Sequence, residues 1–268
     1  MSSARIPPVN RVFALANQKG GVGKTTTAIS LGAYLAAQGE HVLVVDMDPQ
    51  ANATSGLGFD KWHVASSTYD LLIRGTDPAI AILHTNRWGL DMIGASPELA
   101  AAEVEMATME DREARLRRVL EHVGGDYGYI FVDCPPSLGL LTVNALTAAT
   151  DVIIPVQCEY LALEGLSLLL DTIERIRQSL NERLSVFGIV MTMFDSRTNL
   201  AEQVVNEVRA HHPRSIFQTV IPRNVRLSEA PSYGKAILDY DPASRGAAAY
   251  AALAAETLER AAAPAGMV

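Results

Sequence analysis

A glycine-rich segment near the start of the chain has the composition of a phosphate-binding loop. Residues 19–26 read Lys-Gly-Gly-Val-Gly-Lys-Thr-Thr, between a predicted strand over 12–16 and a predicted helix over 25–38. Glycines let backbone N–H groups turn toward phosphate oxygens, and the start of the following helix adds a partial positive charge. Lys24 is placed to reach the outer phosphates of a nucleotide, and the Thr25 hydroxyl is placed to bind Mg²⁺. A tight turn without a ligand is the alternative, which the Gly-Lys-Thr ending disfavours.

Aspartates follow two further predicted strands. Asp46 ends the strand over 41–46, Asp48 comes two residues later, and Asp133 ends the strand over 128–133. Ligands of parallel sheets bind at the carboxyl ends of the strands, so these carboxylates are expected near the loop. We expect Asp133 to hold Mg²⁺ through water and Asp48 to orient or deprotonate an attacking water. Any one of them could instead cap a turn or a helix.

The loop departs from the standard phosphate-loop pattern at its start. The pattern has glycine five positions before Gly23, where this chain has Gln18, and Lys19 follows directly. A second lysine beside the phosphates is redundant within one subunit. Lys19 could therefore stabilise the nucleotide of a neighbouring subunit, as an arginine finger does. A solvated surface lysine is the alternative.

The elements that must position these residues alternate between apolar β-branched runs and helical patterns. This alternation predicts an α/β fold with a mostly parallel central sheet and helices on both faces. We expect one domain over 11–262, a flexible arm over 1–10, a flexible tail over 263–268, and long irregular stretches at 51–66 and 222–242. The predicted strands are 12–16, 41–46, 90–93, 128–133, 151–156, 186–192 and 217–221. The predicted helices are 25–38, 67–73, 97–123 (with possible breaks), 161–180, 200–211 and 243–262.

Composition limits the classes of protein. The chain has 268 residues, of which 49% are hydrophobic, and only two cysteines, Cys134 and Cys158, which excludes a disulfide framework and a four-cysteine metal site. No apolar run approaches the length of about 18 residues that favours a membrane span, so we expect a cytoplasmic protein. The net charge of −8 disfavours indiscriminate nucleic-acid binding, but residues 183–245 contain eight Lys or Arg against six Asp or Glu.

Taken together, these motifs resemble the deviant Walker A group of P-loop NTPases, which contains ParA/Soj partition proteins, MinD and the nitrogenase iron protein. Lys19 matches the signature lysine of that group. Three further segments resemble the chromosomal ParA/Soj branch: residues 46–56 (Asp-Met-Asp-Pro-Gln-Ala-Asn-Ala-Thr-Ser-Gly), residues 194–200 (Phe-Asp-Ser-Arg-Thr-Asn-Leu) and residues 221–232 (Ile-Pro-Arg-Asn-Val-Arg-Leu-Ser-Glu-Ala-Pro-Ser). The resemblance covers about residues 12–258.

The resemblance implies an ATP-driven switch. ATP and Mg²⁺ close a sandwich homodimer, the dimer binds double-stranded DNA without sequence preference, and a ParB/Spo-type centromere-binding partner stimulates hydrolysis and release. It places Lys19, Gly20 and Glu159 at the dimer interface, makes Lys19, Lys24 and Asp48 catalytic, and makes Thr25 and Asp133 supports of the metal. The implied nucleotide-binding residues are Gly20, Gly21, Val22, Gly23, Lys24, Thr25, Thr26, Pro222 and Asn224.

The resemblance also implies a nucleoid-associated protein that serves chromosome or plasmid segregation. The expected DNA-binding residues are Arg197, Arg223, Arg226, Lys235 and Arg245. A MinD-like, membrane-associated ATPase that positions another protein is the alternative. It calls for basic residues and bulky apolar anchors in a C-terminal amphipathic helix, whereas residues 250–268 are alanine-rich and contain no Trp or Phe. We therefore expect no membrane binding. A metabolic synthetase on the same fold would leave residues 223–232 unexplained.

Overall fold

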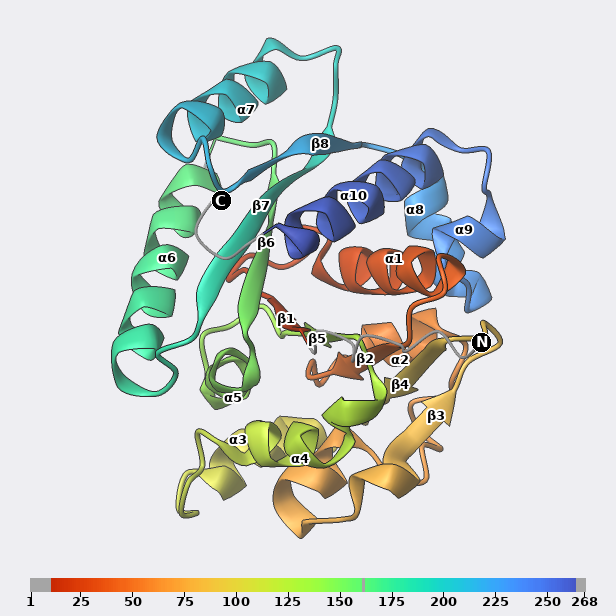
Figure 1. Ribbon diagram of the computed structural model, residues 1–268, viewed down its shortest axis with the longest axis vertical. Helices are drawn as coiled ribbons and strands as arrows, with labels where there is room; N and C mark the ends of the chain where they lie inside the picture. The colour runs from red at the N-terminus through yellow and green to blue at the C-terminus, as the bar shows by residue number, and fades with distance from the viewer. Residues whose placement is uncertain (1–10, 161, 264–268) are drawn as a thin grey trace, which may run out of the picture.

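The central element is one sheet that joins strands from the whole length of the chain. The structure is a computed structural model, and it describes residues 11–160 and 162–263. Eight strands lie in the order β3-β4-β2-β5-β1-β6-β7-β8 (Figure 1). All neighbours pair in parallel except β3 and β4, which pair antiparallel at one edge. The strands are β1 (Arg11–Leu15), β2 (Val42–Asp46), β3 (Ile82–His84), β4 (Leu90–Ile93), β5 (Tyr129–Asp133), β6 (Asp151–Gln157), β7 (Ser185–Phe194) and β8 (Ile216–Pro222).

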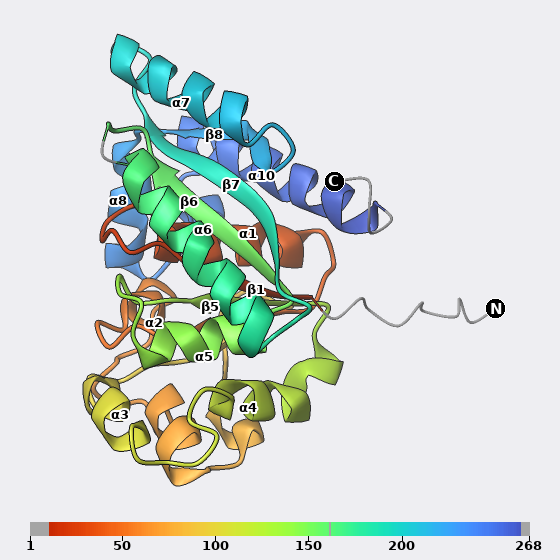
Figure 2. The ribbon, with the colours of Figure 1, turned by 90° about the vertical axis from the view of Figure 1, so that its left-hand side faces the viewer.

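Helices cover both faces of this sheet, so the predicted fold class is confirmed. Helices α1, α9 and α10 pack on one face, and α3 to α7 pack on the other (Figures 1 and 2). The α-helices are α1 (Lys24–Ala37), α2 (Asn52–Gly56), α3 (Leu99–Met106), α4 (Arg115–Val123), α5 (Leu140–Ala148), α6 (Ala162–Ser179), α7 (Asn199–His211), α8 (Val225–Glu229), α9 (Ile237–Tyr240) and α10 (Arg245–Ala262). A π-helical turn at Asp70–Arg74 and 3₁₀ turns at Pro78–Ala81, Gly124–Asp126 and Ala230–Tyr233 complete the helical elements.

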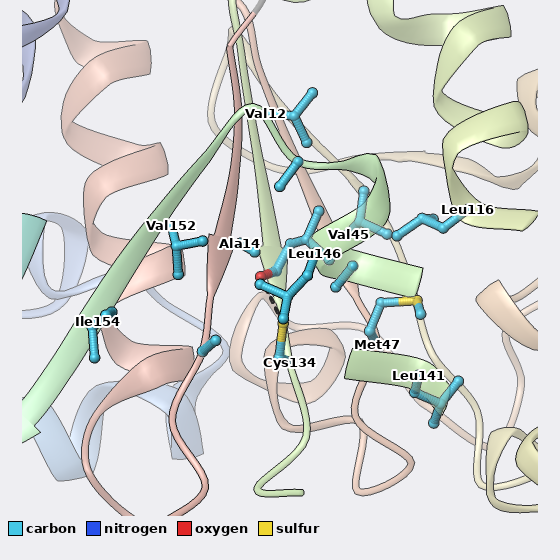
Figure 3. Close-up of a cluster of buried hydrophobic side chains, with 14 of the residues drawn as sticks. Val12, Ala14, Val45, Met47, Leu116, Cys134, Leu141, Leu146, Val152 and Ile154 are labelled. Atoms are coloured by element: carbon cyan, nitrogen blue, oxygen red, sulfur yellow. Dashed lines mark hydrogen bonds between the residues drawn. The ribbon is translucent and has the colours of Figure 1, made fainter. Parts of the chain in front are cut away.

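The central strands β1, β2 and β5 are mostly apolar because both of their faces are buried. In β1, Val12 and Ala14 belong to the cluster beneath α3 to α7, whereas Phe13 and Leu15 belong to the cluster beneath α1 and α10. Successive side chains of a strand point to opposite faces, so a strand covered on both sides alternates between two cores. Figure 3 shows the first cluster, in which Cys134 is one of the buried side chains.

The structure specifies one expectation about the helices and corrects another. The helix predicted over 97–123, with possible breaks, is interrupted, because Asp111 has a φ of 51° in the turn that separates α3 from α4. An α-helix needs negative φ values, so neither helix can continue through this residue. The stretch over 222–242 was expected to be irregular, but it contains α8, α9 and the 3₁₀ turn between them. The expected arm over 1–10 and residues 264–268 of the expected tail lie outside the described residues.

The strand order brings the predicted chemistry together. Strand β5 lies between β2 and β1, so the ends of these three strands are neighbours at one edge of the sheet. In the paired registers, Asp133 lies beside both Asp46 and Leu15, the last residue of β1. Within the described residues, no helix is both long enough and apolar enough to cross a membrane.

Candidate nucleotide-binding site

The loop between β1 and α1 leads directly into a helix N-terminus. Gly23, the residue before α1, has a φ of 94°, and its carbonyl accepts the first helical hydrogen bond from Thr27 N. Only glycine adopts this backbone conformation without steric cost. The loop therefore ends with the free N–H groups of α1 at the carboxyl edge of the sheet, where an anion is favoured by the helix dipole.

Lys24 holds a buried positive charge in this loop. Its side chain is 6% exposed, and its Nζ donates to the carbonyl oxygen of Lys19 at 3.3 Å. Burial lowers the pKa of the Lys24 ammonium, and the charge of Asp133 partly opposes this effect. The Lys24 ammonium is buried and donates to one neutral carbonyl oxygen, which compensates little of the cost of burying its charge. Phosphate oxygens of a nucleotide would supply the negative charge and the further hydrogen-bond acceptors.

Asp46 and Asp133 form a fully buried pair of carboxyls beside the loop. Burial raises the pKa of Asp46 to about 6, and burial together with the charge of Asp46 raises the pKa of Asp133 above its ordinary value. Asp133 Oδ2 accepts from the Thr25 hydroxyl at 2.7 Å, whereas its Oδ1 is buried without a hydrogen-bond partner among the described atoms. A cation beside Thr25 and Asp133 would relieve both the unpaired oxygen and the repulsion between the carboxyls.

These groups fit Mg²⁺. Mg²⁺ prefers hard oxygen ligands, and in nucleotide sites it takes only one or two from protein and the rest from phosphates and water. The Thr25 hydroxyl and the Asp133 carboxylate are such oxygens. No group of three or more His, Cys, Asp or Glu side chains in the described residues has the arrangement of an all-protein metal site. The oxygens of Thr25 and Asp133 are suited to a metal that takes its remaining ligands from a nucleotide and water.

A cleft of about 690 Å³ opens over the loop and joins the two distant parts of the predicted nucleotide site. Asp48 lines it with 7% of its surface exposed, and its Oδ1 accepts from Gln50 N at 2.9 Å. Of the predicted nucleotide-binding residues, Gly20, Gly21, Gly23, Lys24, Thr25, Thr26, Pro222 and Asn224 line the cleft. Pro222 and Asn224 come from the end of β8 and the start of α8, about 200 residues after the loop.

The residues that line the cleft differ from the predicted nucleotide-binding residues in both directions. Val22 does not line it, because its side chain is 1% exposed and points into the protein, where its carbonyl accepts from the Thr192 hydroxyl at 2.8 Å. Thr192 and Met193, at the end of β7, line the cleft but were not predicted. Nothing in their local sequence signals this position. It follows from β7 lying two strands from β1, with β6 between them.

Lys19 does not line the cleft. Its Nζ lies 2.6 Å from Glu159 Oε2, and Gln157 Nε2 donates to Glu159 Oε1 at 2.6 Å. The side chains of Lys19 and Glu159 are 42% and 45% exposed, so this ion pair is open to solvent and adds little stability. Breaking this ion pair, which would release Lys19 for another contact, therefore costs little free energy.

The five basic residues predicted to bind DNA are all exposed, but they differ in their partners. Arg197 donates to Asp195, and Arg226 pairs with both Glu229 and Asp241. Hydrogen bonds from Arg197 lower the pKa of Asp195, and the charge of Arg223 contributes as well. Arg223, Lys235 and Arg245 make no ion pair within the described residues. Arg197 and Arg223 follow the adjacent strands β7 and β8, so the fold brings these two together.

Comparison with known proteins shows similarity over nearly the whole chain. A family model described as an AAA domain matches residues 10–186. "Sporulation initiation inhibitor protein Soj" of Bacillus subtilis is 54% identical over 248 residues, which cover 92% of this chain and 98% of the relative. "Chromosome partitioning protein ParA" of Myxococcus xanthus is 51% identical, over 94% of this chain and 89% of the relative. "Chromosome-partitioning ATPase Soj" of Thermus thermophilus is also 51% identical, over 93% of this chain and 96% of the relative.

Solved structures share the fold. The structure titled cobyrinic acid a,c-diamide synthase from Mycobacterium smegmatis, with bound ADP and magnesium, is 38% identical and has a TM-score of 0.82. It covers 93% of this chain, and the match spans 94% of that chain. The MinD cell division ATPase of Pyrococcus furiosus has a TM-score of 0.78 over 94% of this chain and all of its own, at 23% identity. The MinD structure supports the fold alone.

Proposed function

We propose, on the premise that the chain belongs to the Soj/ParA family of chromosome-partitioning ATPases, that ATP switches it between a free protomer and a DNA-binding dimer. The observation that carries the proposal is the separation of two lysines. Lys24 is buried in the nucleotide cleft, whereas Lys19, five residues earlier, lies outside it on an exposed ion pair. One protomer thus has the residues to bind a nucleotide, but its signature lysine, Lys19, does not reach its own cleft. This arrangement suits an enzyme that hydrolyses ATP only after a second subunit has bound.

For binding, the cleft would take ATP with Mg²⁺. Lys24 and the N–H groups at the start of α1 would hold the phosphates, Thr25 and Asp133 would hold the metal, and Pro222 and Asn224 would border the adenine. The side-chain oxygen of Asn224, Oδ1, accepts a hydrogen bond from Arg226 N at 2.8 Å and thereby caps α8. The side-chain N–H groups of Asn224 would then be available to a ligand. The metal would neutralise the phosphates and the buried carboxyls together.

For hydrolysis, Asp48 would orient the attacking water. Phosphoryl transfer needs positioning and charge neutralisation more than covalent chemistry. Lys19 would leave Glu159 and reach the phosphates of the partner protomer, so that turnover requires the dimer. ATP then favours the dimer because it makes contacts across the interface that a single protomer cannot make.

For partition, the dimer would bind double-stranded DNA through its phosphates and would associate with the nucleoid. Arg197, Arg223, Arg226, Lys235 and Arg245 are exposed, and dimerisation doubles their number. A ParB/Spo-type protein is the partner expected to stimulate hydrolysis and release. The chain also resembles a structure that carries the name of a synthase, and DNA binding distinguishes the two activities.

The test is fluorescence anisotropy of a labelled duplex of random sequence with the Asp48→Ala protein, in ATP and in ADP at two salt concentrations. We expect ATP-dependent binding that weakens with salt. Binding to liposomes instead of DNA would support the MinD-like alternative. If ATP produced dimers that bound neither DNA nor liposomes, the switch between DNA-bound and free states would be refuted.

A further inference from the structure

The loop that carries Asp48 is tied down at both of its ends by one buried carboxylate. Asp46 is fully buried at the end of β2, and its Oδ1 accepts from Asp48 N at 3.1 Å. Its Oδ2 accepts from Thr54 N at 2.8 Å, on the first turn of α2. The two oxygens of Asp46 thus close a ring of the chain from residue 46 to residue 54, and Asp48 lies within it.

The hydroxyl of Thr54 extends this arrangement to a third segment. Thr54 is fully buried, and its Oγ1 donates to Asp46 Oδ2 at 2.8 Å. Thr54 Oγ1 also accepts a hydrogen bond from the backbone N–H of Ala95 at 2.9 Å. Ala95 follows β4, the strand that pairs with β2. One hydroxyl therefore joins the loop of Asp48, the start of α2 and the end of the neighbouring strand.

We infer that Thr54 is a positioning residue for ATP hydrolysis, which holds the Asp48 loop against the ends of β2 and β4 through its hydroxyl. The inference rests on the proposed role of Asp48 as the residue that orients the attacking water. Thr54 itself is buried and does not line the nucleotide cleft. Its effect on turnover is therefore transmitted through the Asp46 carboxylate and the backbone of the loop.

The hydrogen bonds explain why the hydroxyl is needed. The loop turns sharply between Asp48 and α2, since Ala51 has a φ of 52°, a left-handed conformation that costs energy in a residue with a Cβ. Such backbone persists only where its surroundings determine it strongly. Without the hydroxyl, Asp46 Oδ2 keeps a single donor, and the Ala95 N–H is left buried and unpaired. The loop then gains freedom, and a displacement of about 1 Å at a catalytic group can slow turnover about a hundredfold.

The experiment measures kcat and KM for ATP with the full-length Thr54→Val, Thr54→Ser and Asp48→Ala proteins. Valine keeps the shape of threonine and removes the hydroxyl, whereas serine keeps the hydroxyl and removes the methyl. Thr257→Val is the matched control, because Thr257 is also fully buried and, in the part of the chain that the structure describes, its hydroxyl bonds only to the Leu253 carbonyl within α10. Thermal unfolding of every variant is recorded. If Thr54→Val does not fold, Thr54→Ala replaces it.

We expect Thr54→Val to lower kcat at least tenfold while KM stays within about twofold, and Thr54→Ser to restore kcat to within about threefold of the parent. Thr257→Val should keep the parental kcat. The inference is overturned if Thr54→Val turns over like the parent, if Thr54→Ser is as slow as Thr54→Val, or if Thr257→Val slows turnover equally. An Asp48→Ala protein with parental activity would instead refute the role of Asp48, so the two failures are distinguishable.

Discussion

Gly20 offers the sharpest test of a closed dimer, because its own protomer leaves room for a side chain. Gly20 is exposed and lies outside the left-handed backbone region. A Cβ built on it would meet only Pro136 Cβ at 3.7 Å, which is an ordinary van der Waals contact. Any requirement for glycine at this position must therefore come from another molecule. We expect Gly20→Val to change the free energy of unfolding of the protomer by no more than about 0.5 kcal/mol.

The effect on a face-to-face dimer should be much larger. Extra methyl groups in a close-packed contact cost about 1–3 kcal/mol, and a two-fold axis repeats each substitution. The cost to dimerisation is then about 2–6 kcal/mol, which weakens the dimer by about thirtyfold to twenty-thousandfold. We expect Gly20→Val to retain ATP binding, and because Gly20 lines the nucleotide cleft, this binding is measured directly on the variant.

The assay is sedimentation velocity in ATP with the Asp48→Ala protein as background, with and without Gly20→Val. Urea unfolding and nucleotide binding are measured on the same samples. Gly23→Ala is the contrasting variant, because a φ of 94° makes any side chain cost about 1–2 kcal/mol of stability within the protomer itself. If Gly20→Val formed dimers in ATP as readily as the background protein, the face-to-face arrangement of the loops would be wrong.

Four further predictions concern the cleft and the basic residues expected to bind DNA. Lys24→Ala should abolish ATP binding, measured with a fluorescent analogue, because no other buried cation lines the described cleft; a retained affinity would contradict its role. Burial raises the pKa of Asp46 to about 6. Between about pH 4 and pH 6, the Asp46 carboxyl is therefore protonated in the folded protein but ionised in the unfolded chain. In nucleotide- and metal-free protein its contribution to the free energy of unfolding should therefore fall as pH rises from about 4 to 6, and urea titrations of Asp46→Asn should lack that fall. Arg223→Ala should weaken DNA binding and reduce the salt slope by about 1, whereas Asp195→Asn should strengthen binding by freeing Arg197; anisotropy at several salt concentrations tests both.

Much of the site could be predicted because its chemistry is local in sequence. The loop, Lys24 and Thr25 are consecutive, and Asp48 and Asp133 follow apolar strands that could be recognised from composition. The parallel sheet then places the ends of β1, β2 and β5 at one edge, whatever the details of packing. The edge β3, helix α5 and the short helices of 222–242 were missed because short apolar or mixed segments carry a weak periodicity.

Other features depend on contacts between segments that are distant in sequence. Val22 has the sequence context of a ligand-contacting residue, but packing turns its side chain inward, while Thr192 and Met193 reach the cleft from β7. The charges of Arg197 and Arg226 are evident in the sequence, but their carboxylate partners are not. The hydroxyl of Thr54 has a role only because Ala95 lies beside it.

The sequence by itself determined that this chain binds phosphate in an α/β fold and belongs to the Soj/ParA family, since glycine spacing, strand composition and linear motifs need no knowledge of distant neighbours. The tertiary structure decided which polar groups are paired, buried or left open. It places Lys19 on Glu159 outside the cleft, leaves Asp133 Oδ1 without a partner among the described residues, and closes the Asp48 loop through Thr54. Burial and hydrogen bonding are properties of the packed chain, because each depends on atoms brought together only by folding.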